Sequence, residues 1–357
     1  MLPLFNNSNS NDDLVQIPIK IERGSDGIFN QSDYLLFYAE GPATWSYNES
    51  IGYFEHKLHE YTKTTYYYLT DGILQAKEVA QVQSSPTFNR QTSIADAYAY
   101  FERNDTNLIK SGRDWYGESF DIITSQQYNT KLTNLAVGTP IKVRARVAAR
   151  SSSGSSFSIK QNGTSIGTIA LSGVSVGDEL SDFMSVRTEL FSSTLQSDKL
   201  ELTLTFSKPS PSANGWLDYL SVNTRQNLIF TGTPLAFRDL QTVGTGNITK
   251  FIVTGTTPLA KVWDITSIFD TKEIVMQSNG QFSVPTESLR EFIAFDPTKA
   301  PELESFAEVE NQNIHAMGQP NMVIVTHPMF LSQAEGLAEL HRQTDNLTVV
   351  VVTTEQV

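Results

Sequence analysis

The sequence predicts a mainly β protein, made of β-sandwich or jelly-roll modules and followed by the beginning of an α/β domain. Short segments in which apolar and polar residues alternate indicate strands. The composition agrees with this, because it includes 13 Tyr and 20 Phe but only 18% charged residues. A strand, helix and strand pattern near the C-terminus predicts the α/β part. At 357 residues the chain is long enough for roughly two to four domains.

The first predicted unit is an N-terminal β module at residues 1–85. Apolar and polar residues alternate in residues 14–20, and the aromatic runs at 34–38 and 66–69 are also typical of strands. Gly and Asp in residues 23–27 predict a loop between the first two strands.

Residues 86–230 carry the clearest β pattern and predict a jelly-roll-like sandwich. In residues 141–147 the apolar side chains share one face, while Lys142, Arg144 and Arg146 are expected on the solvent face. Asn162-Gly163 predicts a tight hairpin turn. Within the same unit, residues 94–102 are expected to form a short helix.

Two further segments complete the predicted organisation. Residues 231–300 are expected to be a further β segment that extends the sandwich or stands beside it. Residues 301–357 are expected to combine an acidic linker with the first βαβ unit of a truncated α/β domain. Their strands correspond to the apolar runs 322–325 and 347–352, and residues 330–341 have helical spacing.

Composition restricts the classes of function. The net charge of -13 disfavours nucleic acids and anionic membrane surfaces as partners. No apolar run is long enough to cross a bilayer, so we expect no membrane insertion. The sequence contains no Cys, which removes thiol nucleophiles and thiolate metal sites from this chain. No motif predicts a catalytic residue, a metal or a cofactor within it.

One stretch combines charged and aromatic residues in the way that a ligand or partner surface would, and it comprises Arg113, Asp114, Trp115, Tyr116 and Glu118. The structural alternative, which we favour, is an Arg–carboxylate pair that fixes the start of a strand under a buried Trp. Asp218, between Trp216 and Tyr219, has the same two interpretations, and both Trp side chains are expected to be buried.

Histidines offer two weaker candidates. His56 and His59 have a spacing of three, which would suit a metal only on a helix, and their aromatic surroundings argue against one. His327 follows the first predicted parallel strand, at the edge where α/β sheets bind ligands. It would lie beside an active-site crevice in a longer enzyme, or be an ordinary loop residue.

Several stretches resemble one peptidase family. Residues 310–315, 322–328 and 334–340 resemble the start of the catalytic domain of the gingipain-type (C25) cysteine peptidases, which has a caspase-like fold. Residues 24–29, 111–118 and 215–219 resemble stretches that precede that domain in the sortases of type IX secretion. The resemblance implies that the catalytic His and Cys lie beyond Val357, so neither role falls on a residue of this chain.

The resemblance also implies a function. A parent sortase of this kind is secreted through the inner membrane of a Bacteroidetes-type bacterium, acts at the outer membrane or cell surface, and cleaves the C-terminal sorting signals of cargo. This chain would then be its non-catalytic accessory region, with the peptidase domain, secretion components and cargo as protein partners. Two alternatives stay open: a carbohydrate-binding sandwich, and a prodomain-like inhibitor or chaperone of the peptidase domain.

Overall fold

The computed structural model groups the chain into two compact units, Met1–Ala300 and Pro301–Val357, which are treated separately below. The residues that the structure describes are 14–22, 28–31, 33–59, 62–70, 75–178, 180–278, 280–303, 306–309, 314 and 316–356. Residues 24–27 and 310–313, which carry part of the family resemblance, lie outside them. The predicted division of residues 1–300 into three modules stays a prediction.

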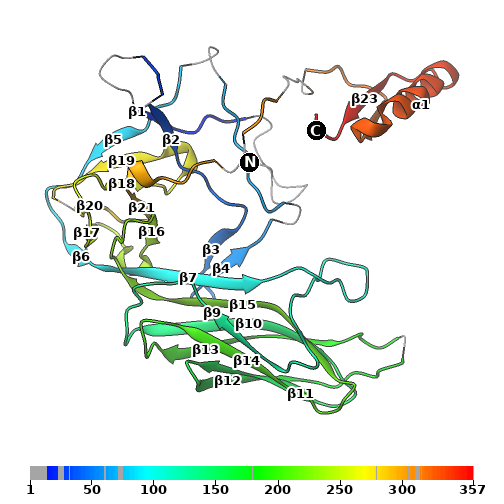
Figure 1. Ribbon diagram of the computed structural model, residues 1–357, viewed down its shortest axis with the longest axis horizontal. Helices are drawn as coiled ribbons and strands as arrows, with labels where there is room; N and C mark the ends of the chain where they lie inside the picture. The colour runs from blue at the N-terminus through cyan, green and yellow to red at the C-terminus, as the bar shows by residue number, and fades with distance from the viewer. Residues whose placement is uncertain are drawn as a thin grey trace. The chain divides into compact units, whose positions relative to one another are not determined.

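The first unit is built around one large, mostly antiparallel sheet (Figure 1). Its strands are, in spatial order, β13 (Ser185–Thr194), β10 (Pro140–Arg150), β15 (Asn214–Asn227), β7 (Ile94–Glu102), β16 (Leu235–Arg238), β21 (Glu291–Phe295), β18 (Lys261–Asp264), β19 (Lys272–Val275) and β5 (Ala80–Gln83). The short strand β8 (Ser119–Phe120) also pairs with β15. The sheet therefore continues from the predicted sandwich region into residues 231–300.

A second sheet packs on one half of the large sheet and closes a β-sandwich. Its strands are β12 (Thr164–Leu171), β11 (Ser155–Gln161), β14 (Glu201–Ser207) and β9 (Ser125–Asn129). The alternating apolar residues of both sheets point inward: Ile141, Val143 and Ala145 from β10 share one buried cluster with Phe157 and Phe206. The predicted mainly β sandwich is confirmed.

The expected helix at 94–102 is wrong, because these residues form strand β7. Ala residues favour a helix when only local preference is considered. Here Ala95 and Ala97 are buried at period two, while Tyr98 and Tyr100 lie on the opposite face. Pairing with β15 along its whole length overrides the local preference.

The other half of the large sheet faces a three-stranded sheet of β20 (Gln281–Pro285), β17 (Ile248–Ile252) and β6 (Arg90–Thr92). Four phenylalanines fill the space between them: Phe237, Phe251, Phe282 and Phe292. The ring centroids of Phe251 and Phe282 are 5.3 Å apart, and those of Phe251 and Phe292 are 5.1 Å apart. This second core is thus separate from the sandwich core.

A buried ion-pair network joins the two halves of the large sheet. Arg225 on β15 donates to Asp96 on β7 at 2.6 Å and to both carboxylate oxygens of Asp239, at 2.6 and 3.0 Å. Arg225 is 8% exposed and Asp239 is 2% exposed, so water screens these bonds little. The pairing fixes Asp239 at the start of a short 3-10 helix, η1 (Leu240–Thr242).

Two hairpins complete the first unit. The hairpin of β3 (Thr44–Asn48) and β4 (Tyr53–Lys57) packs on the outer face of the sandwich, where Trp45 lies 4.3 Å from Tyr98 between ring centroids. The hairpin of β1 (Ile19–Glu22) and β2 (Tyr34–Phe37) contributes Leu36 to a small cluster around Trp263. Two more 3-10 helices are η2 (Ile268–Asp270) and η3 (Pro297–Lys299).

The hairpin of β3 and β4 shows that the expected solvent-exposed face of β10 is wrong. Lys142 donates to the carbonyl of Gly52 at 2.6 Å, and Arg144 pairs with Glu55 of β4. Arg146 is also paired, with Asp218. All three cations are half-buried and bonded: the hairpin covers Lys142 and Arg144, and Asp218 of the adjacent strand neutralises Arg146, which the local alternation does not show.

The second unit is a βαβ arrangement. Strands β22 (Met322–Thr326) and β23 (Val349–Thr353) pair in parallel with Met322 opposite Val349, and α1 (Leu331–Thr344) connects them after the short η4 (Pro328–Phe330). The helix buries Ala334 and Ala338. The predicted strand, helix and strand pattern is confirmed. No helix in the described residues is long and apolar enough to cross a membrane.

Candidate functional site

A β-bulge lies at the centre of the candidate site. Along the β10–β15 pairing, Arg146 is opposite Tyr219 and Val147 is opposite Leu217, which leaves Asp218 as the extra residue. Bulges interrupt the ladder and redirect a side chain, and they are frequent next to functional sites. Here the carboxylate of Asp218, a residue only 7% exposed, accepts a hydrogen bond from the Arg146 guanidinium.

Arg146 has a second, looser carboxylate partner. Its Nη2 atom lies 3.5 Å from Oδ2 of Asp114, which belongs to the loop between β7 and β8. The side chain of Asp114 is 61% exposed, whereas that of Asp218 is 9% exposed. The guanidinium therefore joins a buried carboxylate to an exposed one at the protein surface.

The electrostatics of the cluster make Asp218 a weaker acid than usual. Burial raises the pKa of Asp218, the neighbouring Arg146 lowers it, and the negative charges of Glu102 and Asp114 raise it again, with the result at about 6. The unperturbed value is 3.8. Its charge thus changes between mildly acidic and neutral pH.

Tyr116 brings an unsatisfied hydroxyl to the same place. The residue is 0% exposed, and its Oη atom has no hydrogen-bond partner in the described part of the chain. Burial raises the pKa of Tyr116 to about 12, with smaller influences from Arg146, Asp114 and Asp218. Buried hydroxyls are normally hydrogen-bonded, so this one needs an explanation.

The neighbouring Trp115 is 43% exposed, so its expected burial is wrong. Successive residues of an extended chain point to opposite sides, and Tyr116 takes the buried position instead. Trp216 is partly buried. Trp115 directly follows Asp114, and Trp216 lies two residues before Asp218, so the sequence alone does not tell which ring is covered.

The sequence-predicted surface residues do not stay together. Asp114 and Tyr116 lie at Arg146, while Glu118 is 3.7 Å from Arg103 instead. Arg113 is exposed and belongs to none of the ion pairs among the described residues, so it is not the cation that holds this loop. The sequence did not predict the role of Arg146, because only the bulge brings Asp218 to it.

The two histidines of the first module do not come together on a helix. Nε2 of His56 lies 2.6 Å from the carboxylate of Glu102, and its ring stacks on Tyr100 with centroids 4.4 Å apart. No group of three or more acidic or histidine side chains in the described ranges is placed to hold a metal ion. His56 instead helps to fix the covering hairpin to β7.

His327, in the second unit, follows β22 as expected. Its side chain is exposed, and Nδ1 accepts a hydrogen bond from the backbone of Met329 at 3.2 Å, which caps η4. That contact gives the residue a structural task at the end of the strand. Its suggested position beside a crevice stays a prediction.

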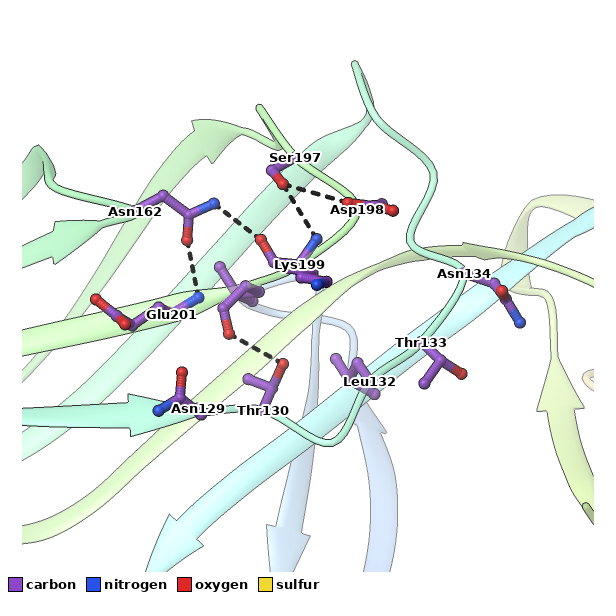
Figure 2. Close-up of a pocket in the computed structure, with 11 residues that line it drawn as sticks. Asn129, Thr130, Leu132, Thr133, Asn134, Asn162, Ser197, Asp198, Lys199 and Glu201 are labelled. Carbon is purple, nitrogen blue, oxygen red and sulfur yellow. Dashed lines mark hydrogen bonds between the residues drawn. The ribbon is translucent and has the colours of Figure 1, made fainter.

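A polar cavity of about 590 Å³ lies at the end of the sandwich where β9 ends and β14 begins (Figure 2). Its lining comprises Asn129, Thr130, Leu132, Thr133, Asn134, Asn162, Ser197, Asp198, Lys199, Leu200 and Glu201. The Asn162 side chain is used internally, because it bonds the backbones of Lys199 and Glu201 at 2.8 Å each. The lining contains no aromatic residue on which a ligand would stack.

The fold and the βαβ unit can be compared with known proteins. Residues 315–357 match the sequence model of peptidase family C25. Over the whole chain, the fold matches the crystal structure of dimeric latent PorU from Porphyromonas gingivalis, with a TM-score of 0.81 and 23% identity. That match covers 99% of this chain and 34% of the PorU chain, so this chain spans about a third of its length.

These two findings confirm the resemblance to the gingipain-type, PorU-like peptidases of family C25 that the sequence predicts. At 23% identity, the structural likeness itself shows the fold. No curated protein sequence matches the chain.

Two xylan-related modules match only part of the chain. One is the CBM36-1 domain of a multidomain xylanase from the hindgut metagenome of Trinervitermes trinervoides, with 14% identity, a TM-score of 0.24 and coverage of 36% of this chain and 94% of that domain. The other is a carbohydrate-binding module CBM36 in complex with calcium and xylotriose, with 12% identity, a TM-score of 0.23 and coverage of 35% and 98%. TM-scores this low carry no argument about ligands.

Proposed function

We propose that this chain is the accessory β region of a cell-surface C25 cysteine peptidase of the type IX secretion system. In this role it positions cargo, or docks the peptidase on its secretion partners. The observation that carries the proposal is the fold shared with PorU over 99% of the chain, together with a C25 match that starts only at residue 315. The β region before that residue is therefore the part that acts on something other than the scissile bond.

The proposal includes the absence of peptidase activity in this chain. Peptidases of this family use a Cys thiolate as the nucleophile, and the sequence has no Cys. The ion pairs at the bulge and at Arg225 are Arg–carboxylate networks, in which Asp218, Asp96 and Asp239 are each held by a cation. They suit recognition better than nucleophilic attack.

The expected partners follow from the same proposal. They are the peptidase domain, the secretion components and cargo with C-terminal sorting signals, all at the outer membrane or cell surface. The net charge of -13 favours protein surfaces over nucleic acids.

A carbohydrate-binding role is the second candidate, and the exposed ring of Trp115 is the observation that favours it. The sheet of β11 and β14 gives it no support. The outward residues of these two strands are small or polar and include Ser156, Ser158, Lys160, Thr203, Thr205 and Ser207. A prodomain-like inhibitor is the third candidate, because it also needs only a β region next to the peptidase.

One experiment separates the three roles. The chain is added in trans to a separately produced C25 catalytic domain, and cleavage is followed for folded cargo and for a short peptide. A positioning role predicts faster cleavage of cargo with an unchanged rate for the short peptide. An inhibitor would slow both reactions, and a sugar-binding module would change neither; either outcome contradicts the positioning role.

A further inference from the structure

The strongest unexplained feature of the first unit is the exposed side of the Arg146 cluster. We propose that Arg146 and Tyr116 form a binding site for the carboxylate of a peptide ligand, and that Asp114 occupies this site in the free protein. The inference goes one step beyond the positioning role and rests on it for the class of partner.

Arg146 is held so that one edge of its guanidinium stays available. Nη1 is bonded to the buried Asp218, which fixes the orientation of the side chain. Among the described residues, Nη2 meets only the exposed Asp114, at 3.5 Å, which is longer than a charge-assisted hydrogen bond. Guanidinium groups bind carboxylates through paired N–H donors, so a ligand carboxylate has a prepared partner.

The exchange is balanced in charge. A ligand carboxylate that replaces the Asp114 carboxylate leaves the same number of negative groups next to Arg146. Asp114 moves into water at little cost, because its side chain is already 61% exposed. By contrast, the site would repel an additional anion, since Glu102 and Asp218 are close by.

Tyr116 supplies the second donor. Its hydroxyl is buried, has no partner in the described residues, and interacts electrostatically with both Arg146 and Asp114. An unpaired buried donor is costly, and an acceptor next to the Arg146 guanidinium removes this cost. Because this hydroxyl is fully covered in the free protein, a ligand carboxylate reaches both donors only once it has displaced Asp114, and its two oxygens then serve one donor each.

Trp115 identifies the rest of the ligand as a peptide. Its ring is 43% exposed, directly beside Asp114 in the chain, and Ile109 of the same loop is 54% exposed. One ring and an aliphatic side chain suit the apolar side chains of a peptide. An acidic oligosaccharide would need a more extended polar or aromatic surface.

The probe is a short N-acetylated peptide of apolar residues with a free C-terminal carboxylate. Its C-terminal amide, and a capped peptide with one internal glutamate, are the comparison ligands. Isothermal titration on the full chain should show binding of the free acid and at least about tenfold weaker binding of the amide. Binding of the glutamate peptide would also support a carboxylate site and would extend it to side chains.

One variant should raise the affinity for the free-acid peptide, and two should lower it. Asp114→Asn should raise the affinity by about three- to tenfold, because the competing carboxylate is gone. Tyr116→Phe should lower it by about fivefold, since one hydrogen bond is lost, and Arg146→Gln should abolish binding. Asp105→Asn, in the same loop but paired with Arg103 at 2.6 Å, is the matched control and should bind as the wild type does.

Equal affinity for acid and amide, or an unchanged or lower affinity in Asp114→Asn, overturns the proposal. Preference for oligogalacturonate over the peptides overturns the peptide assignment. If Arg146→Gln does not fold, the opposite effects of the other two variants still decide. If the chain speeds cargo cleavage in trans but Asp114→Asn and Tyr116→Phe leave peptide binding unchanged, this site fails while the positioning role stands.

Discussion

Replacing Asp218 with Asn should remove part of the pH dependence of stability. The pKa of Asp218 is raised to about 6 in the folded protein, mainly by burial, from an unfolded value of 3.8. The folded state therefore binds a proton more readily than the unfolded state does. Its contribution to stability is complete below about pH 4 and is lost as the pH rises through about 6.

The size of the effect follows from the shift. Each unit of pKa difference is worth about 1.4 kcal/mol. Lowering the pH from about 7 to about 5 should therefore stabilise the wild type by about 1 kcal/mol through this group alone. Asn cannot titrate but still accepts a hydrogen bond from Arg146, so the variant should lack this increment. Other carboxyl groups with a raised pKa, such as Asp96 and Glu291, act in both proteins and cancel in the difference.

Urea unfolding at both pH values measures the prediction. The free energy of unfolding of the wild type should rise by about 1 kcal/mol more than that of Asp218→Asn. Asp105→Asn, which removes an exposed carboxylate from the neighbouring loop, is the control and should behave as the wild type. If Asp218→Asn keeps the full pH dependence, Asp218 is not the group that titrates, and the account of the bulge is wrong.

Three more predictions concern the fold. Arg225→Met should lower the free energy of unfolding by about 3–5 kcal/mol in urea, because it leaves two buried carboxylates unpaired; a loss below about 1 kcal/mol would contradict this. Gly215→Ala should cost about 1–3 kcal/mol, since its Cβ would lie 2.6 Å from the Phe157 ring, whereas Gly41→Ala, with nothing within 4 Å, should be neutral. Removing residues 301–357 should shift the melting temperature by only a few degrees, because the buried core clusters use no residue beyond 300; unfolding would refute this.

The sequence was sufficient to predict a strand or turn wherever the local pattern and the long-range packing favour the same structure. The alternation in residues 141–147 predicts a strand with one buried face, and β10 has one. Asn162 and Gly163 have φ angles of 47° and 82°, as a tight hairpin turn with two positive φ values requires. The apolar runs at 322–325 and 347–352 predict the parallel pair β22 and β23.

The failures share one physical cause, which is contact between segments far apart in the chain. Residues 94–102 have helix-favouring alanines, but their pairing with β15 makes them a strand. The cations of β10 look solvated until the hairpin of residues 44–57 covers them. The candidate site depends on a bulge at Asp218, and no local pattern indicates which of two strands will carry an extra residue.

The most direct test of the proposed function is size-exclusion chromatography with intact-mass detection on the chain mixed with a cargo protein that carries its C-terminal sorting signal. An accessory region that positions cargo predicts a complex that elutes earlier than either protein, with the mass of the cargo unchanged after incubation. Cargo that loses its sorting signal in the presence of the purified chain alone, or cargo that elutes separately at every concentration tested, would contradict the account.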